Sequence, residues 1–420
     1  MRKGKRTIAG IDLGSSKVTS VIAEVTPDEI SIRGINSAPT TSIVKGVIRD
    51  LNQCAAEIDA SFSGAVYASG IHIDQVHLGV TSKDLLSVPL TGEISLGSDE
   101  SEITPEHIER LLEGINPPQR DGNYMRLQRI IQEFEVNETR GVRNPLGMFG
   151  GRLAVRVQDV IGPEWLLSNY RKALERVGLQ LKSLVPSVLA AGEAVLTSEE
   201  RQTGCILLDL GHGTTEIALY RDGAGIFTST ISIGIANFDN DLMQGLGVSL
   251  TEAQRVRRSF MKAWLSAAQA DADDIIDIKF YGHNEYAKVK KQKVVEIAMP
   301  RLEEWALLVK RELNACGLMA SVPGGIVLCG GGCHMREVTG FFQHHLGRPV
   351  RIGMPRGYSH LFEEFRTPSY ASALGIVTFA AHEEYEQRYT EPGPSFLEHV
   401  ADYFVNLLSR FGGKKDEEEK

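Results

Sequence analysis

At 420 residues, with 42% hydrophobic and 24% charged residues, the chain is long enough for two or more domains and has the composition of an ordinary folded protein. This composition excludes a disordered chain and a polytopic membrane protein, and no apolar stretch approaches the roughly 20 residues needed to span a bilayer. The net charge of -9, without a basic stripe interleaved with aromatic residues, argues against nucleic acid as a partner.

The cysteines and the N-terminus predict a cytosolic protein. Five scattered cysteines are an odd number, which favours reduced thiols over a disulfide framework. The first six residues, MRKGKR, lead directly into a strand-like run, without the apolar core or cleavage site of a signal peptide. Cys329 and Cys333 have metal-like spacing, but no second pair of ligands follows, so buried apolar packing is the preferred interpretation.

Two segments in separate halves of the chain share one layout. Residues 8–25, IAGIDLGSSKVTSVIAEV, and residues 205–220, CILLDLGHGTTEIALY, each read as a strand, Asp-Leu-Gly, a turn of small and hydroxyl residues, and a second strand. Because one such β-hairpin begins at Asp12 and another at Asp209, the sequence predicts a duplicated α/β unit.

The region between the two hairpins contains an insertion and then a helical stretch. The insertion, from about Lys83 to Pro163, has a helix start where Thr104 can cap and Pro105 lies in the first turn. It also has two strand-like runs, QRIIQEFEVN and GGRLAVRVQDVI. Residues 164–196 are expected to be helical.

The second half of the chain repeats this organisation. A charged, helical insertion follows the second hairpin, and its last helix is expected from about Pro300 to Cys316. A third glycine motif, GGIVLCGGGCHM at 324–335, reads as a buried strand, a glycine turn and a helix through about Leu346. The segment PVRIGMP then reads as a strand, and a helix of small residues is expected from Thr367.

Both hairpin turns are suited to phosphate. Glycines let backbone N–H groups approach phosphate oxygens without a Cβ clash, and hydroxyl groups add donors. Asp12 and Asp209 end their strands just before the turns, where a carboxylate can hold Mg²⁺ through its waters against the β- and γ-phosphates of ATP. The first cradle consists of Gly14, Ser15, Ser16 and the cationic Lys17, and the second of Gly211, Gly213, Thr214 and Thr215.

An ordinary β-hairpin with glycines at positive φ explains one such turn alone equally well. Two copies and a downstream triple glycine favour a nucleotide site. Rival phosphate-binding folds are excluded because no turn reads G-x-G-x-x-G between a strand and a helix and no Walker A motif occurs. The sequence therefore predicts two facing cradles that clamp one Mg–ATP.

The order of these motifs resembles the superfamily of actin, hexokinase and heat-shock chaperone ATPases. IDLGSSKV, LVPSVLAAGEAVL, LDLGHGTTEI, VLCGGGCHM and PSYASALGIV match its phosphate-1 turn, connecting helix, phosphate-2 turn, adenosine turn and second connecting helix. Within that superfamily the chain is most similar to the FtsA family, through SKDLLSVPL, the compact insertion, RPVRIGMP and a terminal helix. The resemblance implies an α/β, actin-like (ribonuclease H-like) duplicated two-lobe fold with two inserted subdomains.

The resemblance also implies domain boundaries. The first lobe would take residues 1–83, 164–203 and 360–385, and the second lobe residues 204–235 and 317–359. The inserted subdomains would take 84–163 and 236–316, followed by a linker (386–394), an amphipathic helix (395–411) and a charged tail (412–420).

Further site residues follow from the resemblance. Gly331 and Gly332 would lie against the adenosine, flanked by Glu252 and Arg255 of the segment TEAQRVRR. Arg255 stands where a lysine is usual, and a solvated charged helix explains this pair equally well.

Two departures from the family pattern bear on catalysis. His212 replaces the middle glycine of the second phosphate turn, and Pro186 stands about where actin-like ATPases place the Gln or Glu that orients the attacking water. We therefore expect ATP binding to control conformation and assembly, with slow or absent hydrolysis.

Residues 396–411, FLEHVADYFVNLLSRF, have one apolar face at ~100° per residue. A helix of this length, about 24 Å, is too short to span a bilayer but can lie in the membrane interface. Docking on the protein's own core or on a partner is the alternative, although Glu-Pro-Gly-Pro at 391–394 separates the helix from the fold. The apolar face also includes Tyr403, and the residues expected to insert are Phe396, Leu397, Val400, Phe404, Leu407, Leu408 and Phe411.

Partners are implied by the resemblance as well. The insertion 236–316 would receive the C-terminal tail of the tubulin-like division protein FtsZ through Lys291, Lys293 and Arg301, although a solvated charged face explains these basic residues equally well. The insertion 84–163 would contact other copies in a filament and later division proteins. The implied role is an ATP-binding peripheral tether of the FtsZ ring, on the cytoplasmic side of the bacterial membrane at the division site. An actin-like component of type IV pilus assembly and a sugar-kinase-like phosphotransferase are the alternatives.

Overall fold

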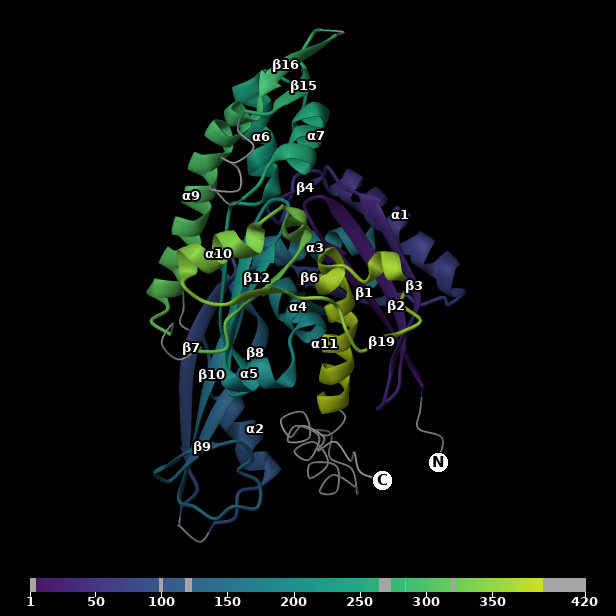
Figure 1. Cartoon of the computed structure of the whole chain (residues 1–420). Helices are drawn as coiled ribbons and strands as arrows, with labels where there is room; N and C mark the ends of the chain where they lie inside the picture. Colours follow the sequence, from purple (N-terminus) through teal and green to yellow (C-terminus); the bar gives the residue numbers. More distant parts are fainter. Residues whose placement is uncertain are drawn as a thin grey trace, which may run out of the picture.

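The structure is a computed structural model that describes residues 5–97, 101–117, 123–263, 273–283, 285–318 and 322–387. The terminal amphipathic helix predicted at 395–411 lies outside these described residues. The described chain forms two lobes, each with its own sheet, and one inserted unit at either end of the molecule (Figure 1).

Lobe I contains a six-stranded sheet covered by helices on both faces. Its strands are β1 (Arg6–Leu13), β2 (Lys17–Val25), β3 (Ile30–Pro39), β6 (Gln75–Val80), β11 (Gln180–Pro186) and β19 (Tyr358–Ser359), and its helices are α1 (Leu51–Ser69), α3 (Glu164–Glu175), α4 (Ser187–Val195) and α11 (Ala371–Gln387). The sheet order is β11-β6-β1-β2-β3-β19. Strands β1, β2 and β3 form an antiparallel meander, and β6 and β11 continue the sheet in parallel.

Lobe II repeats this plan. Its strands are β12 (Cys205–Leu210), β13 (Thr215–Arg221), β14 (Ala224–Ile231), β17 (Ile326–Cys329) and β18 (Val350–Ile352), with helices α5 (Ser198–Thr203) and α10 (Val338–Leu346). An antiparallel meander, β12 to β14, is again continued in parallel, here by β17 and β18. The repeat confirms the predicted duplicated two-lobe α/β fold.

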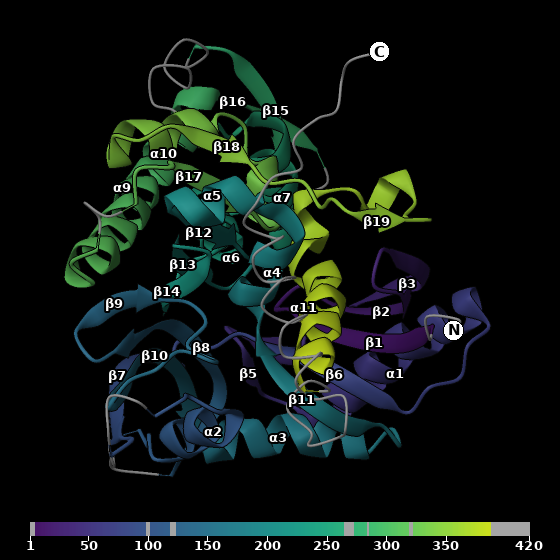
Figure 2. The same ribbon diagram turned by 90° about the horizontal axis from the view of Figure 1, so that it is seen from below.

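The two connecting helices, α4 and α11, pack side by side between the sheets (Figure 2). A Cβ atom on Gly375 of α11 would overlap the carbonyl oxygen of Ala190 in α4. The small residues expected in this helix therefore let the two backbones approach closely. Both helices bury apolar side chains in a core shared by the two lobes.

Two predicted boundaries were wrong. Residues 164–196 are not one helical stretch, because β11 lies between α3 and α4 and pairs in parallel with β6. The helix predicted from Pro300 begins earlier and forms α9 (Lys291–Ala315), since its buried stripe continues through Val294 and Ala298. The helix predicted from Thr367 is present: Thr367 is the N-cap residue of the 3-10 helix η4 (Pro368–Tyr370), which leads directly into α11.

The first inserted unit is a small sheet with one helix. It contains β7 (Leu86–Ser95), α2 (Pro105–Glu113), β8 (Tyr124–Val136), β9 (Thr139–Val142) and β10 (Arg152–Pro163), with sheet order β7-β10-β8-β9. Arg129 donates to both carboxylate oxygens of the buried Asp159 at 2.7 Å and to the carbonyl oxygens of Leu112 and Ile115. This ion pair fixes the end of α2 to the sheet.

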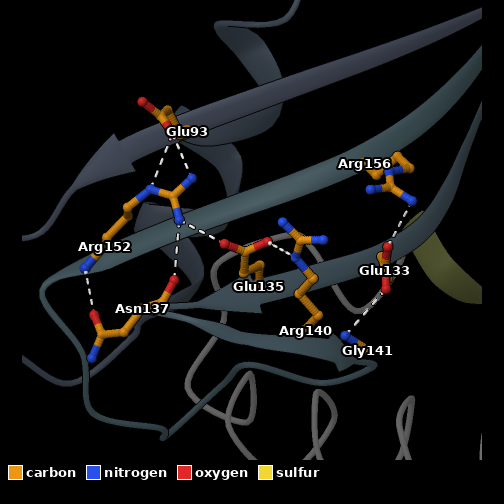
Figure 3. Close-up of polar contacts among 8 residues, drawn as sticks. All are labelled: Glu93, Glu133, Glu135, Asn137, Arg140, Gly141, Arg152 and Arg156. Atoms are coloured by element: carbon orange, nitrogen blue, oxygen red, sulfur yellow. Dashed lines mark hydrogen bonds and ion pairs between the residues drawn. The ribbon is translucent and has the colours of Figure 1, made fainter.

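The opposite face of this sheet carries a row of alternating charges, which we call the charged face (Figure 3). Its ion pairs join Arg152 to Glu93 and Glu135, Arg140 to Glu135, and Arg156 to Glu133. The nitrogen–oxygen distances lie between 2.6 and 3.1 Å.

The second inserted unit packs directly on lobe II. It consists of α6 (Ile235–Leu246), α7 (Leu250–Phe260), β15 (Ile275–Lys279), β16 (Tyr286–Lys290) and α9. Trp305 of α9 is fully buried against Phe238, Phe341 and Phe342, and its indole N–H donates to Thr215 Oγ1 at 2.8 Å. The unit therefore shares one core with the β12–β14 meander. Among the described residues, no helix has the length and apolarity to cross a membrane.

Candidate functional site

The two predicted cradles meet between the lobes. A Cβ atom on Gly213 would lie 3.0 Å from Ser15 Oγ. We call residues 14–17, which lead from β1 into β2, the first turn, and residues 211–215, which lead from β12 into β13, the second turn. A Cβ on Gly14 would lie 2.8 Å from the carbonyl oxygen of Lys17, and one on Gly211 would lie 2.8 Å from that of Thr214. Both turns thus fold tightly for the same reason, a carbonyl group lying over a glycine.

The two aspartates that precede the turns have equivalent partners. Asp12 accepts a hydrogen bond from Ser187 Oγ in α4 (3.4 Å), and Asp209 accepts one from Ser372 Oγ in α11 (2.8 Å). Burial and the nearby charge of Asp209 raise the pKa of Asp12 to about 6, although Lys17 opposes this. Burial also raises the pKa of Asp209. A cation between these two carboxylates would relieve their repulsion.

Glu216 is a third carboxylate at this site that the sequence analysis missed. It lies opposite Asp209 in the β12–β13 pair, is buried, and accepts a hydrogen bond from Thr81 Oγ1 at 2.8 Å. Burial raises the pKa of Glu216 well above its ordinary value, and the charges of Asp209 and Asp12 add to this. An acidic residue in an otherwise apolar strand was the signal available in the sequence.

Lys17 places its ammonium group over an aromatic ring. Its Nζ lies 3.2 Å from the centroid of the ring of Tyr370, the last residue of η4. Burial lowers the pKa of Lys17 to about 8, while Asp12 opposes this shift. The ring and the carboxylate together hold the cation beside the first turn.

Lys45 also reaches the site, from a hairpin that the sequence analysis did not single out. Strands β4 (Ile43–Val44) and β5 (Val47–Ile48) are joined by Lys45 and Gly46, both at positive φ. Lys45 Nζ donates to the carbonyl oxygen of Ser232 in lobe II at 2.8 Å. In the sequence, Lys45 and Gly46 stand between the apolar pairs Ile43–Val44 and Val47–Ile48, a pattern that is typical of a β-hairpin.

The third glycine motif lies beside Asp209. Gly330 has φ +85°, and a Cβ there would overlap Asp209 Oδ1. Gly332 is buried against Leu210, whereas Gly331 has open space on its Cβ side, with Ser369 Oγ nearest at 3.9 Å. Gly331 and Gly332 begin the 3-10 helix η2 (Gly331–His334), and Gly331 is the one with room for a ligand.

Glu252 and Arg255 bond to one another. Arg255 donates to both Glu252 oxygens at 2.8 and 2.7 Å and to the carbonyl oxygen of Asp277, and the Lys279 N–H donates to Glu252. The pair therefore connects α7 to β15.

The two positions that depart from the family pattern offer little to catalysis. Pro186 ends β11 and is buried, so no polar side chain stands there. His212 is half-buried, which lowers its pKa, and its carbonyl oxygen accepts the N–H of Ala236 at 2.8 Å. An attacking water would find no carboxylate or amide at either position.

The basic residues predicted to meet a partner are mostly balanced by acids. Lys291 pairs with Asp274 at 2.7 Å, and Arg301 pairs with Asp241 at 2.7 Å and with Glu304 at 2.5 Å. Arg301, Asp241 and Glu304 line a pocket of ≈ 470 Å³ between α6 and α9, together with Gln244, Gly245, Ile297 and Pro300. Lys293 is exposed.

Two family models match the chain. Cell division protein FtsA matches residues 206–375, and SHS2 domain inserted in FTSA matches residues 83–161. Together they span more than half of the chain, and the second one coincides with the first inserted unit.

Curated relatives match almost the whole chain. It is 28% identical to Cell division protein FtsA of Pseudomonas aeruginosa over 380 residues, covering 90% of each chain. It is 29% identical to that of Borreliella burgdorferi, covering 90% of this chain and 92% of the relative, and 26% identical to that of Escherichia coli K12, covering 89% and 90%.

Solved structures share the fold. A PilM-PilN type IV pilus biogenesis complex superposes with a TM-score of 0.61 at 16% identity, covering 89% of this chain and 98% of the other. MreB 5 of Spiroplasma citri, bound to AMPPNP, superposes with a TM-score of 0.51 at 14% identity, covering 91% and 98%. The fold, both family models and the relatives agree, and the chain belongs to the FtsA family of actin-like cell-division proteins.

Proposed function

We propose that the chain binds Mg–ATP between its lobes, assembles with copies of itself, and anchors FtsZ to the cytoplasmic face of the bacterial membrane at the division site. The observation that carries the nucleotide part is the approach of Ser15 to Gly213, which puts two glycine-hydroxyl turns on opposite sides of one site. Later division proteins would bind to the assembled copies of this chain.

The first and second turns would hold the phosphates with backbone N–H groups, hydroxyl groups and the Lys17 ammonium. Asp12 and Asp209 suit Mg²⁺, because their mutual repulsion favours a cation between them. Mg²⁺ is usually bound through one or two carboxylates together with substrate phosphates and several waters, so Asp12 and Asp209 would hold it against the phosphates, in part through its waters. When bound, Mg²⁺ would neutralise part of the phosphate charge. The AMPPNP complex of the structurally similar MreB 5 supports a nucleotide in this fold.

Turnover would be slow. Hydrolysis requires a polar group that orients water toward the terminal phosphate. Pro186 has no such group, and burial keeps His212 from carrying a proton readily. Bound ATP would therefore act on conformation and assembly.

The pocket between α6 and α9 is the surface best suited to the FtsZ tail. Its lining combines the apolar side chains of Ile297 and Pro300 with the charged side chain of Arg301. An acidic peptide would compete with Asp241 and Glu304 for that guanidinium.

The charged face supports self-assembly. Its glutamates and arginines alternate across neighbouring strands, and the arginines and Glu93 are exposed while Glu133 and Glu135 are partly buried, so another copy could exchange partners with the exposed groups. Exposed pairs of this kind add little to folding stability and are available to an interface.

Membrane attachment rests on the sequence of residues 396–411. A decisive experiment is co-sedimentation of the full chain with phosphatidylethanolamine–phosphatidylglycerol vesicles. Phe404→Glu puts a charge on the apolar face and should leave the protein in the supernatant, whereas Asn406→Glu adds the same charge to the polar face and should still pellet. Fluorescent ATP should bind both variants as it binds the unmodified chain.

The outcomes separate the alternatives. Unchanged pelleting of Phe404→Glu would reject the membrane helix and favour a pilus-type protein that takes a peptide ligand. Rapid phosphate transfer to a small sugar would favour the kinase alternative.

A further inference from the structure

The hairpin turn at Lys45 and Gly46 is fixed beside the second turn. The Tyr170 hydroxyl donates to the carbonyl oxygen of Gly46, and a Cβ on Gly46 would overlap the carbonyl oxygen of Thr81. Thr81 in turn donates to the buried Glu216 at 2.8 Å. The tip of this hairpin is therefore held in place by Tyr170 of α3 and by Thr81, which bonds to Glu216 of the candidate site.

Lys45 adopts a backbone conformation that its residue type does not favour. Its φ of 51° is in the left-handed region, where a Cβ crowds the following carbonyl group. Asn or Asp can offset this with a local side-chain hydrogen bond, but lysine cannot. A lysine at this position therefore points to a role for its ammonium group.

The ammonium group crosses from one lobe to the other. Lys45 Nζ donates to the carbonyl oxygen of Ser232 at 2.8 Å. The chain after Ser232 lies over the second turn, because the N–H groups of Ile235 and Ala236 donate to the carbonyl oxygens of Gly211 and His212. Lys45 thus joins lobe I to the segment that supports the second turn.

The same residue lies next to the tip of the second turn. Its backbone nitrogen is 3.2 Å from the position of a Cβ on Gly213. An ammonium group has three donors, and in the described part of the chain Ser232 is the acceptor recorded for Lys45 Nζ. The ammonium group therefore has two further donors, and its bond to Ser232 holds it next to the segment that covers the second turn.

We infer that Lys45 links the two lobes and makes the chain bind a nucleoside triphosphate more tightly than a nucleoside diphosphate. The inference rests on the proposed ATP binding. A terminal phosphate adds negative charge at the meeting point of the two turns, and the Lys45 ammonium group stabilises that charge while its bond to Ser232 keeps the lobes together. A diphosphate lacks this group and gains less from Lys45.

The test measures how tightly the full chain binds Mg–AMPPNP and Mg–ADP. Lys45→Gly removes the ammonium group and suits the positive φ, so the turn should form as well as before. Asp222→Gly is the matched control, since Asp222 (φ 54°) and Gly223 (φ 83°) form the same kind of turn in lobe II. Lys45→Arg keeps the charge and should retain the preference.

For Lys45→Gly we expect about tenfold weaker binding of AMPPNP, less than about threefold weaker binding of ADP, and an unchanged or higher thermal unfolding midpoint. Asp222→Gly should bind both nucleotides as the unmodified chain does. If Lys45→Gly weakened the binding of both nucleotides equally, or of neither, the proposed role of Lys45 would be wrong, although the proposed ATP binding would not be affected. If the unmodified chain bound neither nucleotide, the proposed function would fail and this inference with it.

Discussion

Ser15 Oγ lies 3.0 Å from the position that a Cβ atom on Gly213 would occupy, so the first turn of lobe I touches the second turn of lobe II. The two residues are almost 200 positions apart in the sequence and lie in turns that join strands of two different sheets. Their approach defines the place where the phosphates of one nucleotide would be held from both sides.

Gly213→Ala tests this contact. Gly213 does not have positive φ, so alanine suits its backbone, but the added Cβ would press on Ser15 Oγ and on the Lys45 nitrogen at 3.2 Å. The turns must then move apart by a few tenths of an ångström. We expect about tenfold weaker Mg–ATP binding by calorimetry with little change in the unfolding midpoint. Gly114→Ala, at a site with ordinary Cβ spacing of 3.5 Å, should bind normally. Normal binding by Gly213→Ala would mean that the turns do not grip the phosphates together.

A buried carboxylate fixes the chain that leads to the Lys45 hairpin. Glu57 of α1 accepts hydrogen bonds from Ser42 Oγ at 2.5 Å, from the Thr41 N–H at 2.9 Å and from Thr40 Oγ1. Burial opposes ionisation of Glu57, but these hydrogen bonds outweigh it and hold its pKa below the ordinary value. The ionised carboxylate therefore stabilises the folded state.

Glu57→Gln should accordingly lower stability in a pH-dependent way. A carboxyl group with a depressed pKa in the folded state contributes stability above its unfolded pKa of about 4.5, and that contribution is lost as the pH falls through the lower folded value. We expect a loss of about 1–2 kcal/mol in the free energy of unfolding at pH 7, from urea titrations, and a smaller loss as the pH falls below about 4.5. A loss that stays constant with pH would assign the effect to packing.

The sequence predicted best those parts of the fold that are formed by contiguous residues. The turns after Asp12 and Asp209 were visible because the strand, the glycines and the hydroxyl residues are contiguous. β11 was missed because its strand conformation depends on pairing with β6, about 100 residues earlier. Residues 291–299 of α9 were missed because Pro300 suggested a start, whereas the buried stripe around Trp305 extends the helix in both directions.

Long-range contacts also explain the site residues that were overlooked. Glu216 is next to Thr215 in sequence, but its role depends on Thr81 from lobe I. Lys45 lies in a two-residue turn, and its partner Ser232 is almost 190 positions away. Hydrogen bonds between distant segments have no sequence pattern of their own.

The charged face makes a prediction about assembly. Arg152 bridges Glu93 and Glu135 at 2.6 and 2.7 Å, with nearly half of its side chain exposed. Arg152→Glu should change the unfolding midpoint little, because exposed ion pairs contribute about 0–1 kcal/mol each. It should reduce ATP-dependent filament formation in sedimentation and light scattering, since the pattern of charges presented to another copy is broken. Arg221→Glu, which removes an exposed pair with Asp222 in lobe II, is the control and should assemble normally. Normal assembly of Arg152→Glu would place the filament contact elsewhere.

If the FtsZ tail binds in the pocket between α6 and α9, substitutions of Arg301 and of its partner Asp241 should change the affinity for the tail in opposite directions. Arg301 donates to both oxygens of Asp241, at 2.7 and 3.0 Å. An acidic peptide would therefore compete with Asp241 for the hydrogen-bond donors of the Arg301 guanidinium. Arg301→Gln should weaken binding of a fluorescent FtsZ-tail peptide about tenfold or more in anisotropy titrations, because it removes the charge-assisted hydrogen bonds. Asp241→Asn should strengthen binding, because it frees the guanidinium of a charged competitor.

Arg311 provides the matched control for this experiment. It lies on the same helix, is exposed, and pairs with its neighbour Glu312 at 3.4 Å. Arg311→Gln removes one positive charge from α9 without touching the pocket, so peptide affinity should stay within about twofold of the unmodified chain at physiological salt, where distant exposed charges are screened. If Arg301→Gln and Arg311→Gln weakened binding equally, the peptide would respond to the overall charge of the helix. If Asp241→Asn weakened binding as much as Arg301→Gln, the ion pair itself would be needed to shape the pocket, and direct contact between Arg301 and the peptide would be wrong.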